Sequence, residues 1–298
     1  MNRLITVVSV VVLLLVSTAA FAQYTTTVLI EGVGLVPARQ MGMGAVGVAA
    51  ADDAGAINYN PANLASLDIA PPAGMYSRYD PYAKPWNWQI AGTAEVSGDL
   101  DFWGVHMAGT DPQNNWGVGA SYQSVSPSSE SHWWMVGTGA QFGNSNFQWG
   151  VSMMDAELYG GETTFNVGLL YTQQLPDGPP LRIGLTGEDV TDELNIGPLF
   201  NVGIAYPLRV SSNQQLLLAA DLLDATDEIN SVINVGVEFQ PCTNWTIRGG
   251  VIDIDDSSNV TAGLGYDGGS WRADVAWQES ASSSRDDEIA VTGSYLLK

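Results

Sequence analysis

Apolar and polar residues alternate with a period of two along most of the chain. In residues 116–122 the Trp, Val, Ala and Tyr side chains share one face, and Gly and Ser share the other. Residues 165–169, 200–204 and 233–239 repeat this scheme. Because successive side chains of a β-strand point to opposite faces, the pattern predicts strands with one apolar and one polar face. We count 14 such segments between Trp86 and Leu297.

Glycines and turn residues divide these segments. Glycines recur on the polar face, as at Gly117, Gly168 and Gly203, and one segment, 216–221, has none. Polar stretches rich in turn-forming residues, such as 280–287, separate the segments. A tilted strand that crosses a bilayer takes about 9–11 residues. The spacing therefore fits membrane-spanning strands joined mostly by short turns.

The composition of the polar face decides between water and lipid as the outer surroundings. A soluble sandwich would carry Lys and Glu on its outward face, but here the polar face is mostly small and uncharged. Aromatic residues near segment ends fit the girdles of a membrane barrel, and closure removes exposed strand edges. We therefore expect an all-β fold, an antiparallel transmembrane β-barrel of about 14 strands; a soluble β-sandwich or β-helix is the alternative.

This fold predicts which side chains face lipid and which face the lumen. The residues expected to face lipid are Trp116, Trp149, Phe165, Val167, Val235, Trp245 and Trp277. The residues expected to face the lumen include Gly117, Asn166, Asn234, Arg248 and Asp274.

The N-terminus has the features of an export signal. A basic start at Arg3 precedes an apolar run, 4–16, and Ala20-Phe21-Ala22 fits a cleavage site. The run is shorter than the ~20 residues of a spanning helix, which disfavours the alternative of a membrane anchor. We expect residues 1–22 to be a cleaved signal peptide, with the mature protein starting at Gln23 in the outer membrane of a Gram-negative-type cell.

The segment 33–65 differs from the strands that follow. It is rich in Gly and Ala, lacks the period of two, and ends in the turn-forming residues Asn58-Tyr59-Asn60-Pro61. Its motifs A-R-Q-M-G-M-G at 38–44, A-A-A-D-D-A at 49–54 and N-P-A-N-L-A at 60–65 resemble the N-terminal signature of the PorV/PorQ-like family. This family lies in the FadL-like outer-membrane barrel superfamily. The C-terminal half is similar as well, for example in G-L-G-Y at 263–266.

The resemblance implies a 14-stranded barrel whose N-terminal segment folds into the lumen as a hatch. It assigns residues 23–68 to the hatch and 69–298 to the barrel. The hatch residues singled out are Arg39, Gly42, Gly44, Asp52, Asp53, Asn60 and Pro61. We expect Arg39 to pair with Asp52, Asp53, Glu238 or Asp274, and Asn60-Pro61 to end the segment, because proline stops a helix or strand.

Charges on the polar face belong in the lumen, because an arginine facing lipid near the midplane costs about 2–4 kcal/mol. The polar and charged residues expected to line the lumen are Arg182, Glu238, Arg248, Arg272 and Asp274. We expect them to form a structural ion-pair network that also holds the hatch; direct contact with a substrate is the alternative.

Other chemistry is sparse in the sequence. The chain has 298 residues, a net charge of −22 and only 14 % charged residues, so it has no basic stripe for nucleic acid. There is one cysteine, Cys242, and the two histidines, His106 and His132, are far apart and expected at aqueous surfaces. We predict no enzyme, cofactor or metal site. The acidic runs 221–227, 253–256 and 286–288 are expected in solvated loops, with Ca²⁺ or Mg²⁺ binding as the alternative.

Two functions fit these observations. The first is a transporter or channel for small molecules, hydrophobic ones included, as in FadL-type members, although this chain lacks their long extracellular insertions. The second is a non-catalytic accessory barrel that binds secreted or envelope proteins, as PorV-type members do in type IX secretion. The partners expected are outer-membrane lipid and either a small hydrophobic substrate or a secreted protein, with no nucleic acid.

Overall fold

The computed structural model describes most of the chain after residue 35. The described residues are 36–67, 87–97, 100–111, 114–126, 132–156, 162–175, 179–193, 198–211, 213–225, 231–254, 258–279 and 287–297. The signal peptide 1–22, the cleavage site and the start of the expected hatch lie outside these residues. The boundary expected at residue 69 does so as well, and these assignments stay predictions.

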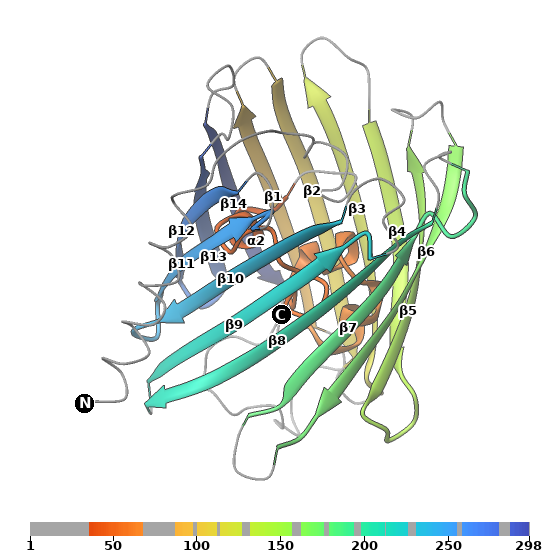
Figure 1. Ribbon diagram of the computed structural model, residues 1–298, viewed down its shortest axis with the longest axis horizontal. Coiled ribbons are helices and arrows are strands. Elements are labelled where there is room, and N and C mark those ends of the chain that lie inside the picture. The colour runs from red at the N-terminus through yellow and green to blue at the C-terminus, as the bar shows by residue number, and fades with distance from the viewer. Residues whose placement is uncertain are drawn as a thin grey trace.

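Fourteen antiparallel strands form a closed barrel (Figure 1). The strands are β1 (Asn87–Ser97), β2 (Leu100–Asp111), β3 (Trp116–Ser126), β4 (His132–Gln141), β5 (Phe147–Ala156), β6 (Glu162–Gln173), β7 (Leu181–Glu188), β8 (Leu199–Ser211), β9 (Gln214–Leu223), β10 (Val232–Gln240), β11 (Trp245–Ile252), β12 (Asn259–Asp267), β13 (Trp271–Gln278) and β14 (Glu288–Leu297). Each strand pairs with its neighbours in the chain, and β1 pairs with β14 to close the ring. The predicted fold class is confirmed.

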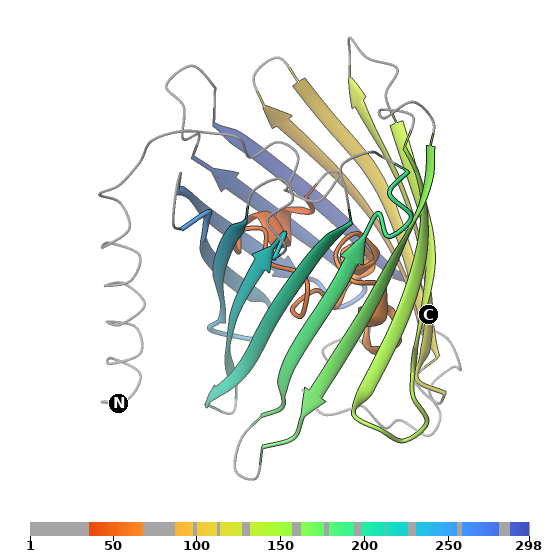
Figure 2. The same cartoon turned by 45° about the vertical axis from the view of Figure 1, so that its right-hand side comes forward.

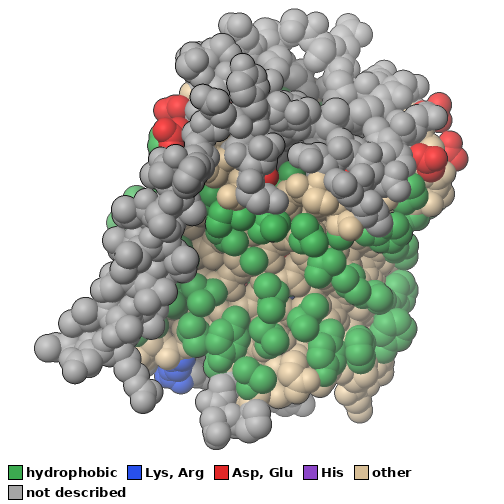
Figure 3. All heavy atoms as spheres, viewed as in Figure 1, with side chains coloured by type: hydrophobic (Ala, Val, Ile, Leu, Met, Phe, Trp, Pro, Cys, Tyr) green, Lys and Arg blue, Asp and Glu red, His purple; other side chains and the backbone are tan. Residues whose placement is uncertain are grey.

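The alternation of apolar and polar residues follows the two faces of the wall. In β6, Phe165 and Val167 are exposed on the outer face, while the alternate residues Thr164 and Asn166 are buried in the lumen. An apolar belt therefore covers the outside of the barrel (Figure 3). A belt of this kind matches the hydrocarbon core of a bilayer.

The individual expectations for the two faces agree with the structure. Trp116, Phe165, Val167, Trp245 and Trp277 are exposed on the outer face, and Trp149 and Val235 are half-buried there. Gly117, Asn166, Asn234, Arg248 and Asp274 are buried on the inner face.

Aromatic rings gather near both ends of the strands. At one end the ring of Tyr266 lies 4.9 Å from that of Trp245 and 5.3 Å from that of Trp271. At the other end the rings of Trp103 and Tyr122 are 5.5 Å apart. Tyrosine and tryptophan favour the membrane–water interface because they have both an apolar ring and a polar group. The two groups of rings fit the two interfaces of a bilayer.

The two ends of the barrel differ in the length of their connections. At one end the strands are joined by segments such as 189–198 and 279–287, and at the other by short ones such as 212–213 and 268–270. Barrels of this kind have short periplasmic turns and longer extracellular loops. We therefore call the end with the longer connections the outer rim.

Residues 36–67, called the hatch below, lie inside the ring of strands (Figures 1 and 2). The hatch contains α2 (Ala38–Met41), η2 (Ala54–Asn58) and η3 (Pro61–Ser66). Helix α2 packs against β12–β14, η2 against β1–β4, and η3 against β2–β6. No helix of the described residues is long and apolar enough to cross a bilayer.

The prediction that Asn60-Pro61 ends the segment is wrong. Asn60 is the N-cap of η3, where its side chain accepts a hydrogen bond from the amide of Ala62, and Pro61 is the first residue of that helix. Asparagine is a favoured N-cap, and proline is favoured in the first helical turn because that position needs no amide donor. The hatch therefore continues through η3 to Leu67.

Candidate functional site

The hatch backbone rests directly on glycines of the wall. If a Cβ were added at Gly250, it would lie 2.2 Å from the amide nitrogen of Gly44, and one at Gly150 would lie 2.2 Å from the carbonyl carbon of Pro61. Nine inward glycines on β3–β8 and β10–β12 meet backbone atoms of the hatch in this way, and we call them the glycine arc. They are Gly117, Gly139, Gly150, Gly168, Gly184, Gly203, Gly236, Gly250 and Gly263.

The two hatch glycines singled out in the sequence make the same close contacts. A Cβ at Gly42 would lie 2.9 Å from the Cα of Gly263. Gly44 has a φ of +71°, which favours glycine, and a Cβ there would lie 2.6 Å from the carbonyl oxygen of Val235. Both glycines thus allow the hatch backbone to approach the wall.

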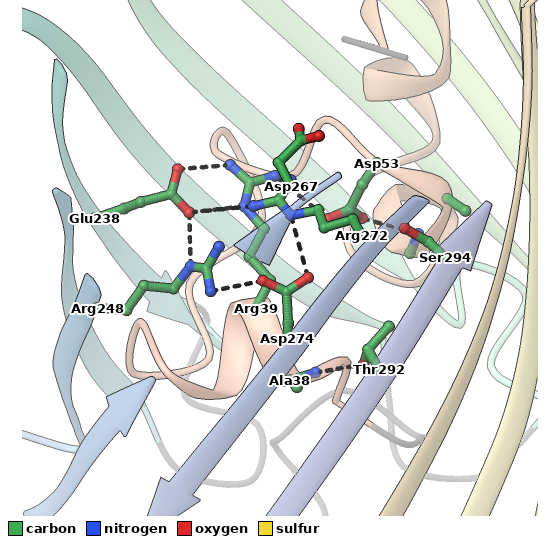
Figure 4. Close-up of polar contacts among 12 residues, drawn as sticks. Ala38, Arg39, Asp53, Glu238, Arg248, Asp267, Arg272, Asp274, Thr292 and Ser294 are labelled. Atoms are coloured by element: carbon green, nitrogen blue, oxygen red, sulfur yellow. Dashed lines mark hydrogen bonds and ion pairs between the residues drawn. The ribbon is translucent and has the colours of Figure 1, made fainter. Parts of the chain in front are cut away.

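Arg39 anchors the hatch to the wall through carboxylates (Figure 4). Its Nε lies 3.0 Å from Oε2 of Glu238 on β10, and its Nη1 pairs with Asp52 and with Asp53 of the hatch. Burial lowers the pKa of Arg39, but the three carboxylates raise it more, so the pKa lies well above its usual value. Arg39 is therefore a permanent cation that holds two parts of the hatch on the wall.

The ion pairs continue along the wall from Glu238. Oε2 of Glu238 also accepts a hydrogen bond from Nε of Arg248, at 2.7 Å. Arg248 in turn pairs with Asp274, with Nη1 and Oδ1 2.8 Å apart, and Nε of Arg272 lies 3.2 Å from the other oxygen of Asp274. These residues, with Arg39, Asp52 and Asp53, form one network, which we call the charged cluster.

The structure thus brings together most of the charged residues expected at the site. Arg39 contacts three of its four candidate partners, and Asp274 binds Arg248 and Arg272 instead. Arg182 lies apart from the cluster, and its Nη2 donates to Oδ1 of Asn63 in η3 at 3.3 Å. Every charge of the cluster has an opposite charge beside it, which is required when charges are buried.

Other wall side chains hold backbone amides of the hatch. The carboxylate of Asp221 on β9 accepts hydrogen bonds from the amides of Gly47, at 2.6 Å, and Val48, at 3.0 Å. Oε1 of Gln89 on β1 accepts one from the amide of Ala54 at 2.7 Å. Hydroxyls of Thr261 and Thr292 accept from the amides of Gly44 and Ala38, both at 2.9 Å. Sequence reasoning missed these residues as contacts, although their inward parity in the strands was readable.

His106 does not lie at an aqueous surface, which corrects that expectation. It is fully buried on β2 under the hatch, with Nδ1 3.0 Å from the hydroxyl of Ser121 and 3.3 Å from Nδ2 of Asn58. Its Nε2 has no hydrogen-bond partner among the described residues. Its burial follows from η2 of the hatch, which packs across β1–β4 and covers this part of the wall.

A small cavity, lined by charged, polar and small apolar residues, lies between the hatch and the wall beside His106. Its volume is about 20 Å³, which is room for about one or two water molecules. The hatch residues lining it include Pro37, Arg39 and Asp53, and the wall residues include Gln89 and Arg272. A solute larger than water cannot pass this cavity unless the hatch moves.

The acidic runs are not simply solvated loops. Asp221, Asp224 and Asp253 are buried at the outer ends of strands. The carboxylate of Asp221 accepts a hydrogen bond from the amide of Gly47. The amides of Asp224 and Asp253 donate to the side-chain oxygens of Asn201 and Asn234. Among the described residues no three His, Cys, Asp or Glu side chains gather as a metal site. Parts of the runs 221–227, 253–256 and 286–288 lie outside the described residues.

Comparisons with known proteins place this architecture among outer-membrane barrels. No family model and no curated protein matches the sequence. The toluene transporter TbuX of Ralstonia pickettii aligns over 91 % of this chain and 100 % of its own, with a TM-score of 0.59 and 13 % identity. A deletion mutant of the monoaromatic hydrocarbon channel TodX aligns over 88 % and 98 %, with a TM-score of 0.52 and 12 % identity.

A FadL homologue of Pseudomonas aeruginosa is similar to the same extent. It aligns over 89 % of this chain and 99 % of its own, with a TM-score of 0.52 and 10 % identity. At these identities the likeness concerns the fold. The protein thus shares the fold of these outer-membrane β-barrels.

Proposed function

We propose that this protein is an outer-membrane channel or transporter for small molecules, and that the hatch is its barrier. The observation that carries the proposal is that residues 36–67 lie in the lumen against the arc of nine wall glycines, and that the cavity beside His106 has room only for water. A barrel without a hatch would be open, so the hatch decides what passes. The similarity of fold to the transporters named above supports the same class of function.

The way in which the hatch is held also supports a movable barrier. Apart from close packing, it is held by ion pairs and hydrogen bonds, such as those of Arg39 with Glu238 and of Asp221 with the amide of Gly47. Polar contacts of this kind can be replaced by hydrogen bonds to water when the hatch moves. A covalent cross-link between hatch and wall could not be replaced in this way. The hatch can therefore shift within the lumen while the closed ladder of the wall stays intact.

The solutes could be hydrophobic or hydrophilic, and different features favour each class. The fold likeness to hydrocarbon transporters favours hydrophobic solutes. The cavity favours hydrophilic ones, because its lining includes the side chains of Arg39, Asp53, Gln89 and Arg272.

Flux through proteoliposomes tests the proposal for both classes. The full chain and a variant lacking residues 36–67 are reconstituted at equal density, and efflux of a small sugar and of a toluene-sized aromatic probe is recorded. We expect the deletion to speed efflux of the sugar several-fold. If a folded deletion variant leaks no faster than the full chain for either probe, the hatch is not the barrier.

A further inference from the structure

The hatch does not seal all sectors of the wall in the same way. Along the glycine arc, on β3–β8 and β10–β12, hatch atoms occupy the positions where a wall side chain would begin. At the seam where β14 meets β1, the inward positions at the same level are Ala91, Thr292 and Ser294, and the cavity lies in front of them. The seam is also where the area packed by α2 ends and that packed by η2 begins.

The lining of this sector is polar on both sides of the seam. Ala91 is the pairing partner of Ser294 on β14 and of His106 on β2, so the three lie side by side. Nε2 of Gln89 donates to the hydroxyl of Ser294 at 3.0 Å, and the hydroxyls of Thr93 and Thr292 are 2.9 Å apart. These pairs form a polar track along the seam.

The track continues from the cavity to the outer rim. The inward residues of β1 are Gln89, Ala91, Thr93 and Glu95 in order, and Glu288 of β14 also faces inward near the outer rim. No inward residue of β1 between residues 89 and 95 carries a large apolar side chain. The buried Nε2 of His106, which lines the cavity without a hydrogen-bond partner among the described residues, is matched to a polar occupant such as water.

From these observations we propose that the route of passage runs between α2 and η2 along the β14–β1 seam, and that it takes small hydrophilic solutes. This inference rests on the proposed function and adds its route and solute class. The route is the sector where the hatch backbone meets wall side chains through hydrogen bonds, as the amides of Ala38 and Ala54 do with Thr292 and Gln89. A small displacement of α2 from η2 widens the existing cavity there, whereas widening along β3–β8 or β10–β12 would require the hatch backbone to leave the glycine arc.

Two alanines of almost equal static burial provide a matched test. Ala91 on the route is 5 % exposed and belongs to a cluster with Ala54 and Ile57 of the hatch, and Ala219 on β9, in a cluster with Met43 and Val46 of the hatch, is 7 % exposed. Replacing Cys242, the one cysteine of the sequence, by serine gives a background without thiols. Ala91→Cys and Ala219→Cys in this background are then exposed to silver ions in nitrate buffer, in lipid vesicles. The thiols that silver has not reached are counted with a fluorescent maleimide after unfolding.

We expect silver to reach the cysteine at position 91 about tenfold faster or more, because the sector around the cavity, where hydrogen bonds to wall side chains hold the hatch, opens at lower free energy than the glycine arc. Equal rates, a faster reaction at position 219, or no reaction at position 91 would overturn the route. Ser294→Cys is a second variant should Ala91→Cys not fold, and it is expected to react as fast. A hatch that acts as a barrier in the flux experiment together with equal silver rates would reject the route and leave the proposed function standing.

Discussion

Along β3–β8 and β10–β12 the hatch backbone lies against glycines, whereas at the charged cluster, whose wall residues stand on β10, β11 and β13, the hatch is held by long side chains of opposite charge. The first contact excludes water because no side chain stands between the two backbones. The second positions the hatch but leaves space for water, as the cavity beside Arg39 and His106 shows. The comparison teaches that sealing and holding are separate tasks carried by different residue types, even on one strand, as Gly236 and Glu238 show on β10.

The largest loss of stability is expected when Arg39, the central cation of the charged cluster, is removed. Arg39→Ala leaves the carboxylates of Asp52, Asp53 and Glu238 buried beside one another, and breaking a buried pair costs about 3–5 kcal/mol. Urea unfolding in detergent micelles should show a loss of this size. Glu238 still pairs with Arg248 in this variant, but the carboxylates of the cluster then outnumber its arginines. Adding Glu238→Gln should recover part of the loss by removing one of the excess carboxylates; if the double variant is less stable than the sum of the single changes, the charges are not what holds the hatch.

A smaller loss of stability is expected when a side chain is added at the glycine arc. Gly150→Ala places a methyl group 2.2 Å from the carbonyl carbon of Pro61, and overpacking of this kind typically costs about 1–3 kcal/mol. We expect the amides of η3 to exchange hydrogen faster because the hatch is displaced. Gly92→Ala is the matched control, since its Cβ would meet nothing within 4 Å. Equal exchange of η3 in both variants would contradict the sealing role of the glycine arc.

A third change separates holding by charge from holding by hydrogen bonds. Asp221→Asn keeps the shape of the side chain but replaces a charged acceptor of the Gly47 and Val48 amides by a neutral one. We expect a loss of about 1–2 kcal/mol, seen as roughly tenfold faster hydrogen exchange at these two amides. Unchanged protection at residues 47 and 48 would show that Asp221 does not hold the hatch.

The smallest effect is expected from a change confined to the wall. Oδ1 of Asn166 accepts a hydrogen bond from the amide of Asp189, which has a φ of +48° at the outer end of the β7 strand. Asn166→Ala should lower the free energy of unfolding by about 1 kcal/mol without changing hydrogen exchange in the hatch. Faster hydrogen exchange of hatch amides would contradict this expectation, because it would show that a change confined to the wall also loosens the hatch.

The sequence was sufficient to predict the strands of the wall, because period-two alternation predicts which residues of each strand face inward and which face outward. Thus Phe165 and Asn166 could be assigned to opposite faces without any knowledge of the fold. It also identified Glu238, Arg248 and Asp274 as lumen charges, because a charge on a membrane strand is too costly on the face toward lipid. Arg39 was placed in the lumen only through the family resemblance of the hatch motifs. Most of the charged cluster was therefore readable before its geometry was known.

The contacts between hatch and wall were not readable in the same way. Gly150 and Pro61 are far apart in the chain, and nothing in either residue states that they touch. Asn60-Pro61 was misread as a stop because an N-cap followed by proline starts a helix as readily as it ends one. His106 was misplaced because the hatch that buries it packs across β1–β4.

Single-channel current in planar bilayers tests the central claim most directly. The full chain and a variant lacking residues 36–67 are inserted from detergent under the same salt and voltage, after both have been shown to fold as β-barrels. The account predicts small or no openings for the full chain and a stable, several-fold larger conductance for the deletion. Equal conductance of the two folded proteins would contradict the claim that the hatch, sealed along the glycine arc, closes this barrel.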